Sequence, residues 1–457
     1  MYTPANNLLP QNNRPNMTRH FLVAVIFILF AFSAVGAPPS QSIPPASSSA
    51  ATPVPEPPRK ITEYSLSPEL FKKANTLGNI HFVFRLFRFL YFVFVLWFLL
   101  GRKVSAQFRD WAESASRFRF VQAIIYAPLS VLAIALMQIP LDIFNESLSK
   151  HYGISVQSWS SWTSDWLTFQ LLTVIFATFF AWILLAIVRG SPRRWWLYFW
   201  VVSVPILLFI FSLQPLLIDP LFNKFEPLSA KAPELIPQLE RITVRGGMPI
   251  PPDRMFWMLA SDKTIYTNAY VTGIGATKRV VIWDTAIAKE TSGGILTMFG
   301  HEMGHYVLNH IWKGFAFVSG MIFVLLYLGY RTIGWVLRRK GVAWGIRGLD
   351  DWAALPALLL IIAVFGFVAN VLGNAYSRYQ ESQADIYSLE VTHGIVSDPG
   401  GACLVSFQMY GEQVFAQPKP NLLNVLLFYD HPTVADRMHV CATYDPWSEG
   451  RSPRYVK

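Results

Sequence analysis

Six long apolar segments constrain this 457-residue chain more than any other feature of its sequence. Each is long enough to cross the hydrocarbon core of a bilayer as one helix, which takes about 20 residues. They lie at residues 82–101, 120–144, 167–189, 195–218, 315–337 and 353–376. Only 14% of the residues are charged, whereas a typical soluble domain has about 25%. We therefore expect a mainly α-helical, multi-pass membrane protein.

The first 60 residues differ from the rest of the chain. Arg19 precedes an apolar run at residues 21–36, which ends in small residues. This pattern predicts that residues 1–37 are a secretory signal peptide or an uncleaved N-terminal anchor, which would be a seventh span. Residues 38–60 are rich in Pro, Ser and Ala, and they predict an extended linker.

The basic residues gather in three loops between the apolar segments, at residues 102–119, 189–194 and 338–347. All three loops fall on one side of the membrane if the six spans alternate. The segment 145–166, on the other side, has Lys150 as its only Lys or Arg. The positive-inside rule therefore places the three basic loops in the cytoplasm.

By the same alternation, residues 219–314 and 377–457 face outward. We expect an integral protein of the bacterial inner membrane, with these two segments on the periplasmic face. The net charge of +10 is explained by the loops that set this orientation, so we expect no nucleic-acid partner.

Two arginines, Arg85 and Arg88, lie near one end of the first apolar segment. Long basic side chains in such places often snorkel to the membrane surface, and otherwise charged residues at membrane depth face an interior cavity. The closeness to the segment's end favours snorkelling here.

The polar region after the fourth span contains recognisable local structure. The pattern predicts the following elements: a helix at 233–245 ended by Gly246 and Gly247, a strand at 254–259, a hairpin of 268–272 with 280–283, and a helix at 292–312.

The last of these helices contains His301-Glu302-Met303-Gly304-His305, an HExxH motif. Residues four apart lie on one face of a helix, so both imidazoles can reach one Zn²⁺ while Glu302 faces its open position. There Glu302 could act as the general base for a bound water. A helix that carries two histidines by chance remains the alternative on five residues alone.

A catalytic zinc needs a third protein ligand, and the segment after the last span offers one. Glu381 and Asp385 lie one turn apart in a helical pattern. Glu381 would be the ligand, and Asp385 would accept a hydrogen bond from a ligating imidazole. An ordinary solvated helix face would show the same spacing.

Several motifs together resemble the zinc metallopeptidases of the CAAX prenyl protease 1 family. They are HEMGH with the downstream Glu381-x-x-Ala384-Asp385, the segment Asn268-Ala-Tyr-Val-Thr-Gly, Asp430-His431-Pro432 followed by Arg437, Pro140-Leu-Asp-Ile-Phe-Asn, and the run from Ile218 to Leu228. The resemblance runs from about residue 60 to 445, with several motifs in the family's order.

The resemblance implies a function and a role for each matching residue. The chain would be an integral-membrane zinc metalloendopeptidase that holds one Zn²⁺ with His301, His305 and Glu381 and uses Glu302 as the base. His431 would steady the oxyanion, and Arg437 would brace its segment. Asn268 and Ala269 would belong to an edge strand that pairs with the substrate backbone.

The family also implies a chamber enclosed by the membrane helices and capped by the peptidase domain. The expected domains are a membrane domain at 61–218 with four spans, and a zinc metallopeptidase domain at 219–457, with a small β-sheet, interrupted by the spans at 315–337 and 353–376. The partners would be membrane lipid and a peptide or protein substrate, lipidated or membrane-associated.

Two departures from the family make prenylated peptides a doubtful substrate. The predicted outward face of the catalytic residues is opposite to that of eukaryotic members, and the Pro/Ser/Ala-rich leader is foreign to the family. An envelope quality-control protease, a catalytically silent chaperone that holds peptides, and a transporter with structural zinc remain alternatives.

The remaining metal-ligating residue types are not assigned to the site. Cys403 and Cys441 do not form a Cys-x-x-Cys pair, and we expect them to be free thiols or to form one disulfide. His310 is interpreted as a loop histidine.

Overall fold

The computed structural model describes residues 61–273 and 275–456. The expected signal peptide or anchor at 1–37 and the linker at 38–60 lie outside the described residues. Within these residues, six helices are long and apolar enough to cross a membrane. They are α2 (Pro68–Gly101), α4 (Arg119–His151), α5 (Trp159–Gly190), α6 (Trp195–Leu213, continued to Phe222 by a π-helical turn and the short α7, Asp219–Phe222), α11 (His310–Trp344) and α12 (Leu355–Thr392).

The six predicted spans are confirmed as helices, but most of these helices extend well beyond the apolar segments. Helix α12 has 38 residues, or a length of about 57 Å at 1.5 Å per residue. A bilayer core is only about 30 Å thick. The second half of α12 therefore continues past the apolar segment at 353–376 as the same helix, and this half carries Glu381 and Asp385.

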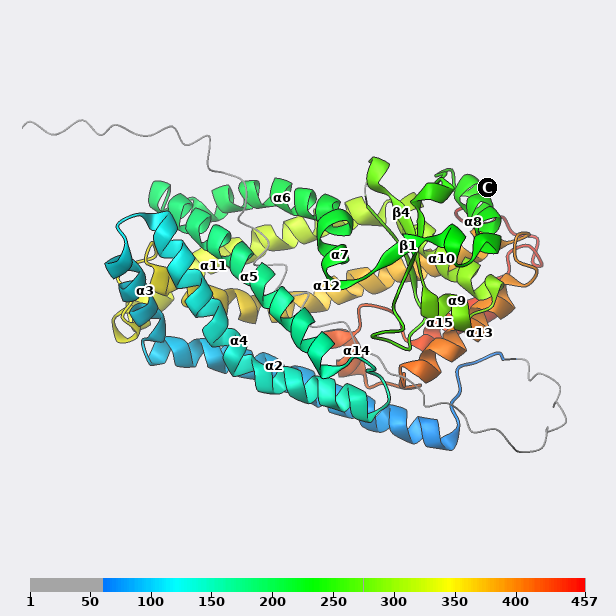
Figure 1. Ribbon diagram of the computed structural model, residues 1–457, viewed down its shortest axis with the longest axis horizontal. Helices are drawn as coiled ribbons and strands as arrows, with labels where there is room; N and C mark the ends of the chain where they lie inside the picture. Colours follow the sequence, from blue (N-terminus) through cyan, green and yellow to red (C-terminus); the bar gives the residue numbers. More distant parts are fainter. Residues whose placement is uncertain (1–60, 274, 457) are drawn as a thin grey trace, which may run out of the picture.

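The long helices lie roughly along the long axis of the molecule (Figure 1). The short helix α3 (Val104–Ala115) and the turn between α11 and α12 lie at one end, shown at the left. The strands lie toward the other end, with α8 (Ile236–Arg245), α9 (Asp284–Lys289), α10 (Ser292–Val307), α13 (Pro399–Gln413) and α15 (Val434–Thr443). The loops 102–119 and 345–352 therefore lie far from the end that carries HExxH.

A four-stranded sheet has the order β1-β2-β4-β3. Its strands are β1 (Phe225–Pro227), β2 (Met255–Met258), β3 (Ala269–Thr272) and β4 (Arg279–Trp283). The predicted hairpin is confirmed, because β3 and β4 pair antiparallel with Ala269 opposite Ile282. Strand β3 is consequently an edge strand.

Helix α10 lies between this sheet and α12. Val280 and Ile282 of β4 form one buried cluster with Phe299 and Met303 of α10 and Tyr387 of α12. Burying large apolar side chains of this kind stabilises a fold by about 1.5–3 kcal/mol each. This cluster fixes the HExxH helix against the second half of α12.

The predicted helix at 292–312 is too long. Helix α10 ends at Val307, and Asn309 has a left-handed backbone with φ 58° before α11 begins at His310. Asn is one of the few residues that adopt this conformation at low cost. The turn redirects the chain from the site into the fifth span.

The two cysteines form a disulfide, Cys403–Cys441, which settles the alternative left open by the sequence. It joins α13 to α15 within the end of the molecule that carries HExxH.

Candidate metal centre

Close packing of α10 against α12 sets the geometry of the site. A Cβ added to Gly304 would come within 3.1 Å of the Cα of Ala384, and one added to Gly300 would come within 3.2 Å of Ser388 Oγ. The glycine of HEMGH and the alanine of Glu381-x-x-Ala384-Asp385 are therefore the points of closest approach. Small residues at these positions let the imidazoles of α10 reach the carboxylates of α12.

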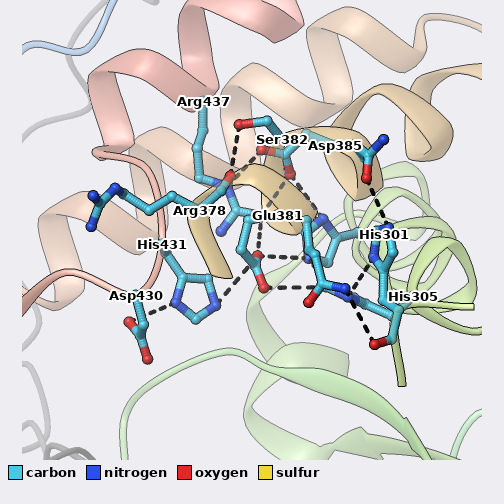
Figure 2. Close-up of polar contacts among 12 residues, drawn as sticks. His301, His305, Arg378, Glu381, Ser382, Asp385, Asp430, His431 and Arg437 are labelled. Carbon is cyan, nitrogen blue, oxygen red and sulfur yellow. Dashed lines mark hydrogen bonds and ion pairs between the residues drawn. The ribbon is translucent and has the colours of Figure 1, made fainter. Parts of the chain in front are cut away.

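The side chains of His301, His305 and Glu381 meet in the space between the two helices (Figure 2). His301 Nε2 lies 3.1 Å from Glu381 Oε2, and His305 Nε2 lies 3.4 Å from Glu381 Oε1. The two Nε2 atoms lie 3.1 Å from each other. Three ligand atoms, one from each residue, lie within 4.8 Å of one another.

This donor set fits a metal ion. Glu381 Oε2 is buried and accepts no hydrogen bond, although His301 Nε2 lies close to it. A buried carboxylate oxygen without a donor is costly. Two imidazole nitrogens and one carboxylate that converge on one point match the ligands of Zn²⁺ in catalytic sites.

Asp385 and Arg437 lie behind His301. His301 Nδ1 lies 2.8 Å from Asp385 Oδ1. Arg437 holds the same carboxylate with two bonds, Nε to Oδ2 at 2.9 Å and Nη2 to Oδ1 at 2.6 Å. The carboxylate accepts the Nδ1 proton of His301, so Nε2 keeps its lone pair directed toward Glu381.

Glu302 follows His301 on α10 and lines the cavity described below. Burial is the main cause that raises the pKa of its carboxyl group, against the opposing effect of the two histidines. A raised pKa makes a carboxylate a stronger base.

His431 approaches Glu381 from the side opposite to α10. Its Nε2 lies 3.4 Å from Glu381 Oε2, and its Nδ1 lies 2.9 Å from Asp430 Oδ1. Burial disfavours protonation of this imidazole, but the hydrogen bond to Asp430 and the charges of Glu381 and Asp430 together raise the pKa of His431. The Asp430 carboxylate accepts from Nδ1–H and orients the ring, and the raised pKa favours the imidazolium form, which also carries an N–H at Nε2.

The loop that carries His431 is anchored to α12 by side chains that the sequence reasoning missed. Asn374 Nδ2 donates to Leu427 O at 2.8 Å, and Arg378 donates to the carbonyls of Val425 and Tyr429. Both anchors hold α14 (Leu422–Phe428) and its end. The i, i+4 spacing of Asn374 and Arg378 is the only signal in the sequence, and nothing local indicates their partners.

A cavity of about 1370 Å³ extends from the site into the membrane helices. Its walls include His301, Glu302 and His431 at one end and Phe180, Leu326 and Leu358 among the spans. The chamber implied by the resemblance is therefore present.

Arg85 and Arg88 both line this cavity, so the expectation that they snorkel is wrong. Arg88 Nη2 lies 2.6 Å from Asp142 Oδ1 of α4, and the Arg85 guanidinium lies over the Phe428 ring at 5.7 Å. The sequence of the first apolar segment does not reveal this partner, because Asp142 lies 54 residues after Arg88 in the chain.

Asn268 and Ala269 also line the cavity, where β3 begins. The backbone carbonyl of Asn268 accepts from Trp283 N at 3.0 Å on the β4 side. The other edge of β3 pairs with no strand among the described residues. This edge is where an extended chain could add to the sheet.

Comparisons with known proteins agree with this geometry. A family model described as peptidase family M48 matches residues 229–444, and one described as the CAAX prenyl protease N-terminal region with five membrane helices matches residues 50–224. The uncharacterized metalloprotease YhfN of Bacillus subtilis is 34% identical over 396 residues, which cover 83% of this chain and 89% of the relative.

More distant relatives share the same architecture. The CAAX prenyl protease 1 homolog of Homo sapiens is 23% identical over 75% of this chain and 78% of its own length. The crystal structure of S. mikatae Ste24p matches with a TM-score of 0.69 and 21% identity, covering 83% of this chain and 90% of that one. The chain therefore belongs to peptidase family M48, and it is an integral-membrane metalloprotease of the CAAX prenyl protease 1 type.

Proposed function

We propose that this metalloprotease is zinc-dependent and that His301, His305 and Glu381 hold one Zn²⁺ per chain. The observation that carries the proposal is the convergence of their three ligand atoms around a buried carboxylate oxygen that lacks a hydrogen bond. Three protein ligands leave one coordination position open, as in catalytic zinc sites, whereas structural sites are normally closed by four. A transporter with structural zinc is therefore disfavoured.

Each neighbouring side chain has a task in peptide hydrolysis. Zinc, when bound, would polarise the scissile carbonyl and acidify a water molecule. Glu302 takes the proton of the attacking water and passes it to the leaving amine. His431, held by Asp430, donates its Nε2–H to the oxyanion that develops on the substrate.

The substrate backbone would lie along the free edge of β3, starting at Asn268 and Ala269. Pairing with an edge strand delivers an extended peptide without regard to its side chains. The cavity continues from this edge to the apolar walls among the spans. We infer that membrane-associated or unfolded peptides are hydrolysed, and that an attached lipid would occupy the apolar part.

Two independent features support an outward-facing catalytic end. The segments 102–119 and 338–352, which include α3 and the last residues of α11, lie at the end of the molecule opposite the HExxH helix, and their basic residues favour the cytoplasm. The Cys403–Cys441 disulfide lies at the HExxH end, and disulfides persist in oxidising compartments. We propose the periplasmic face of a bacterial inner membrane, where prenylated peptides have no evident source.

The mechanism is tested with purified protein and its Glu302→Gln form on an unfolded peptide, with and without a lipid chain. Loss of the base should slow hydrolysis by about 10²–10⁴-fold, and a chelator should abolish the wild-type rate. Glu234→Gln, at an exposed glutamate, is the matched control. Equal rates for Glu302→Gln and wild type would contradict the mechanism and favour a peptide-holding role.

The orientation is tested separately with reporters fused after Lys457. A reporter that is active only in the periplasm should give signal. Activity of a reporter that works only in the cytoplasm would overturn the outward face while leaving the zinc chemistry intact.

A further inference from the structure

His310 is not the loop histidine that its sequence context indicates. It is the first residue of α11, and only 3% of its surface is exposed. Its Nδ1 lies 3.1 Å from His305 Nδ1, and its Nε2 lies 3.2 Å from Gln383 Oε1. A continuous row of polar side chains thus runs from α12 to the second histidine of HExxH.

The backbone holds the His310 ring against His305. The left-handed Asn309 turns the chain back at the end of α10, so that His310 faces His305 with the ring centroids 5.1 Å apart. Gln380 Nε2 donates to the backbone carbonyl of His310 at 3.2 Å. Two glutamines that flank Glu381 on α12 therefore hold His310, one by its backbone and one by its ring.

The hydrogen bonds of Gln383 match one arrangement of the protons on His310 and His305. Its Nε2 donates to the hydroxyl oxygens of Tyr379 and Tyr455, at 3.3 and 3.4 Å. In this orientation the amide oxygen faces His310 at 3.2 Å and accepts from Nε2–H. A neutral imidazole protonated at Nε2 has a lone pair at Nδ1, so His310 Nδ1 accepts the proton of His305 Nδ1–H.

We propose that His310 and Gln383 are positioning residues for His305, an inference that rests on the zinc site proposed above. They fix the tautomer in which His305 Nε2 carries a free lone pair and faces His301 and Glu381. Asp385 does the same for His301. The two ligating histidines thus have different partners, an anionic carboxylate backed by Arg437 and a neutral imidazole backed by an amide.

The inference predicts a change in metal binding as well as in activity. Partners of ligating histidines typically contribute 10–100-fold to metal affinity. His310→Leu fills the site but accepts no hydrogen bond, so it should weaken zinc binding by about 10-fold or more. His310→Asn offers an amide oxygen near the position of Nδ1, and it should recover most of that loss.

Gln383→Leu tests the same row without altering either histidine. Without the amide acceptor, His310 is free to take the Nδ1–H tautomer, which would oppose His305 Nδ1–H donor to donor. This variant should also weaken zinc binding, whereas Gln383→Glu, which keeps the acceptor, should not.

The experiment measures the zinc dissociation constant of the purified full-length protein by competition with a chromophoric chelator, and the visible absorption of the cobalt-loaded protein. His439→Leu, at an exposed histidine on α15, is the matched control and should bind zinc like the wild type. An unchanged zinc dissociation constant and an unchanged cobalt spectrum in both His310→Leu and Gln383→Leu would overturn this inference but not the proposed zinc site. A wild-type protein that binds no zinc would overturn the proposed zinc site and this inference with it.

Discussion

Replacement of Asp385 by Asn tests whether the Asp385 carboxylate fixes the orientation of His301. The carboxylate accepts from His301 Nδ1 and from two nitrogens of Arg437, and only 3% of its residue surface is exposed. An amide has one acceptor end and one donor end. If its oxygen takes the place of Oδ1 and faces His301, its NH₂ opposes Arg437 Nε. If the amide is flipped, its NH₂ opposes both His301 Nδ1–H and Arg437 Nη2.

Either orientation leaves at least one buried donor opposed, and Arg437 keeps only the more distant Glu381 carboxylate, at 3.7 Å, as a counter-charge. A 10–100-fold loss of metal affinity corresponds to about 1.4–2.7 kcal/mol. We therefore expect Asp385→Asn to raise the zinc dissociation constant within this range. The apo protein should also unfold at a lower temperature, because a buried arginine that loses its closest anion is costly.

Zinc titration against a competing chelator measures the first effect, and thermal unfolding in detergent with and without zinc measures the second. Asp253→Asn, at an exposed aspartate, is the control. Zinc affinity equal to that of the wild type would refute the view that this carboxylate fixes His301.

Three further predictions concern stability outside the metal centre. Glu390 is fully buried and accepts from the Tyr444 hydroxyl and three backbone N–H groups of residues 454–456; Glu390→Gln should lower the free energy of unfolding by about 2 kcal/mol or more, and an unchanged melting temperature would contradict it. Cys403→Ser removes the disulfide to Cys441 and should cost about 2–4 kcal/mol, so a reductant should lower the melting temperature of the wild type but not of the variant. Burial raises the pKa of Glu290, so ionisation of this carboxyl group destabilises the fold as pH rises through that pKa. Glu290→Gln should therefore raise the melting temperature at pH 8 more than at pH 4. Equal shifts at the two pH values would argue against the burial effect.

The features that sequence reasoning recovered are local and periodic. Apolar length alone located the six spans, alternation located the hairpin, and the i, i+4 spacing of His301 and His305 placed two candidate ligands on one helical face. The i, i+4 spacing of Glu381 and Asp385 on one continuous helix offered Glu381 as a ligand but equally fitted a solvated helix face, and the family resemblance favoured the ligand. His431, in contrast, rested on family resemblance, since a loop histidine has no local signal for its distance to α10.

The features that it missed depend on contacts between distant residues. Arg88 points inward because Asp142 of another helix lies beside it. His310 reaches the site because one residue, Asn309, adopts a left-handed backbone and breaks the expected helix. Neither contact appears as a periodic pattern in the sequence, so only the folded structure reveals them.

Helix α12 explains why a site assembled from distant segments can still be encoded by short motifs. Asn370, Asn374, Arg378, Glu381 and Asp385 follow one another at spacings of four, four, three and four, which keeps them on one face of a helix. The first three hold the loop before His431, and the last two meet the histidines of α10. No Pro or Gly interrupts α12 after Gly373, so the distance between the His431 loop and the candidate ligands is set by helix geometry. Helix α12 begins among the membrane spans, and it thereby fixes the positions of the His431 loop and of the candidate ligands relative to the cavity.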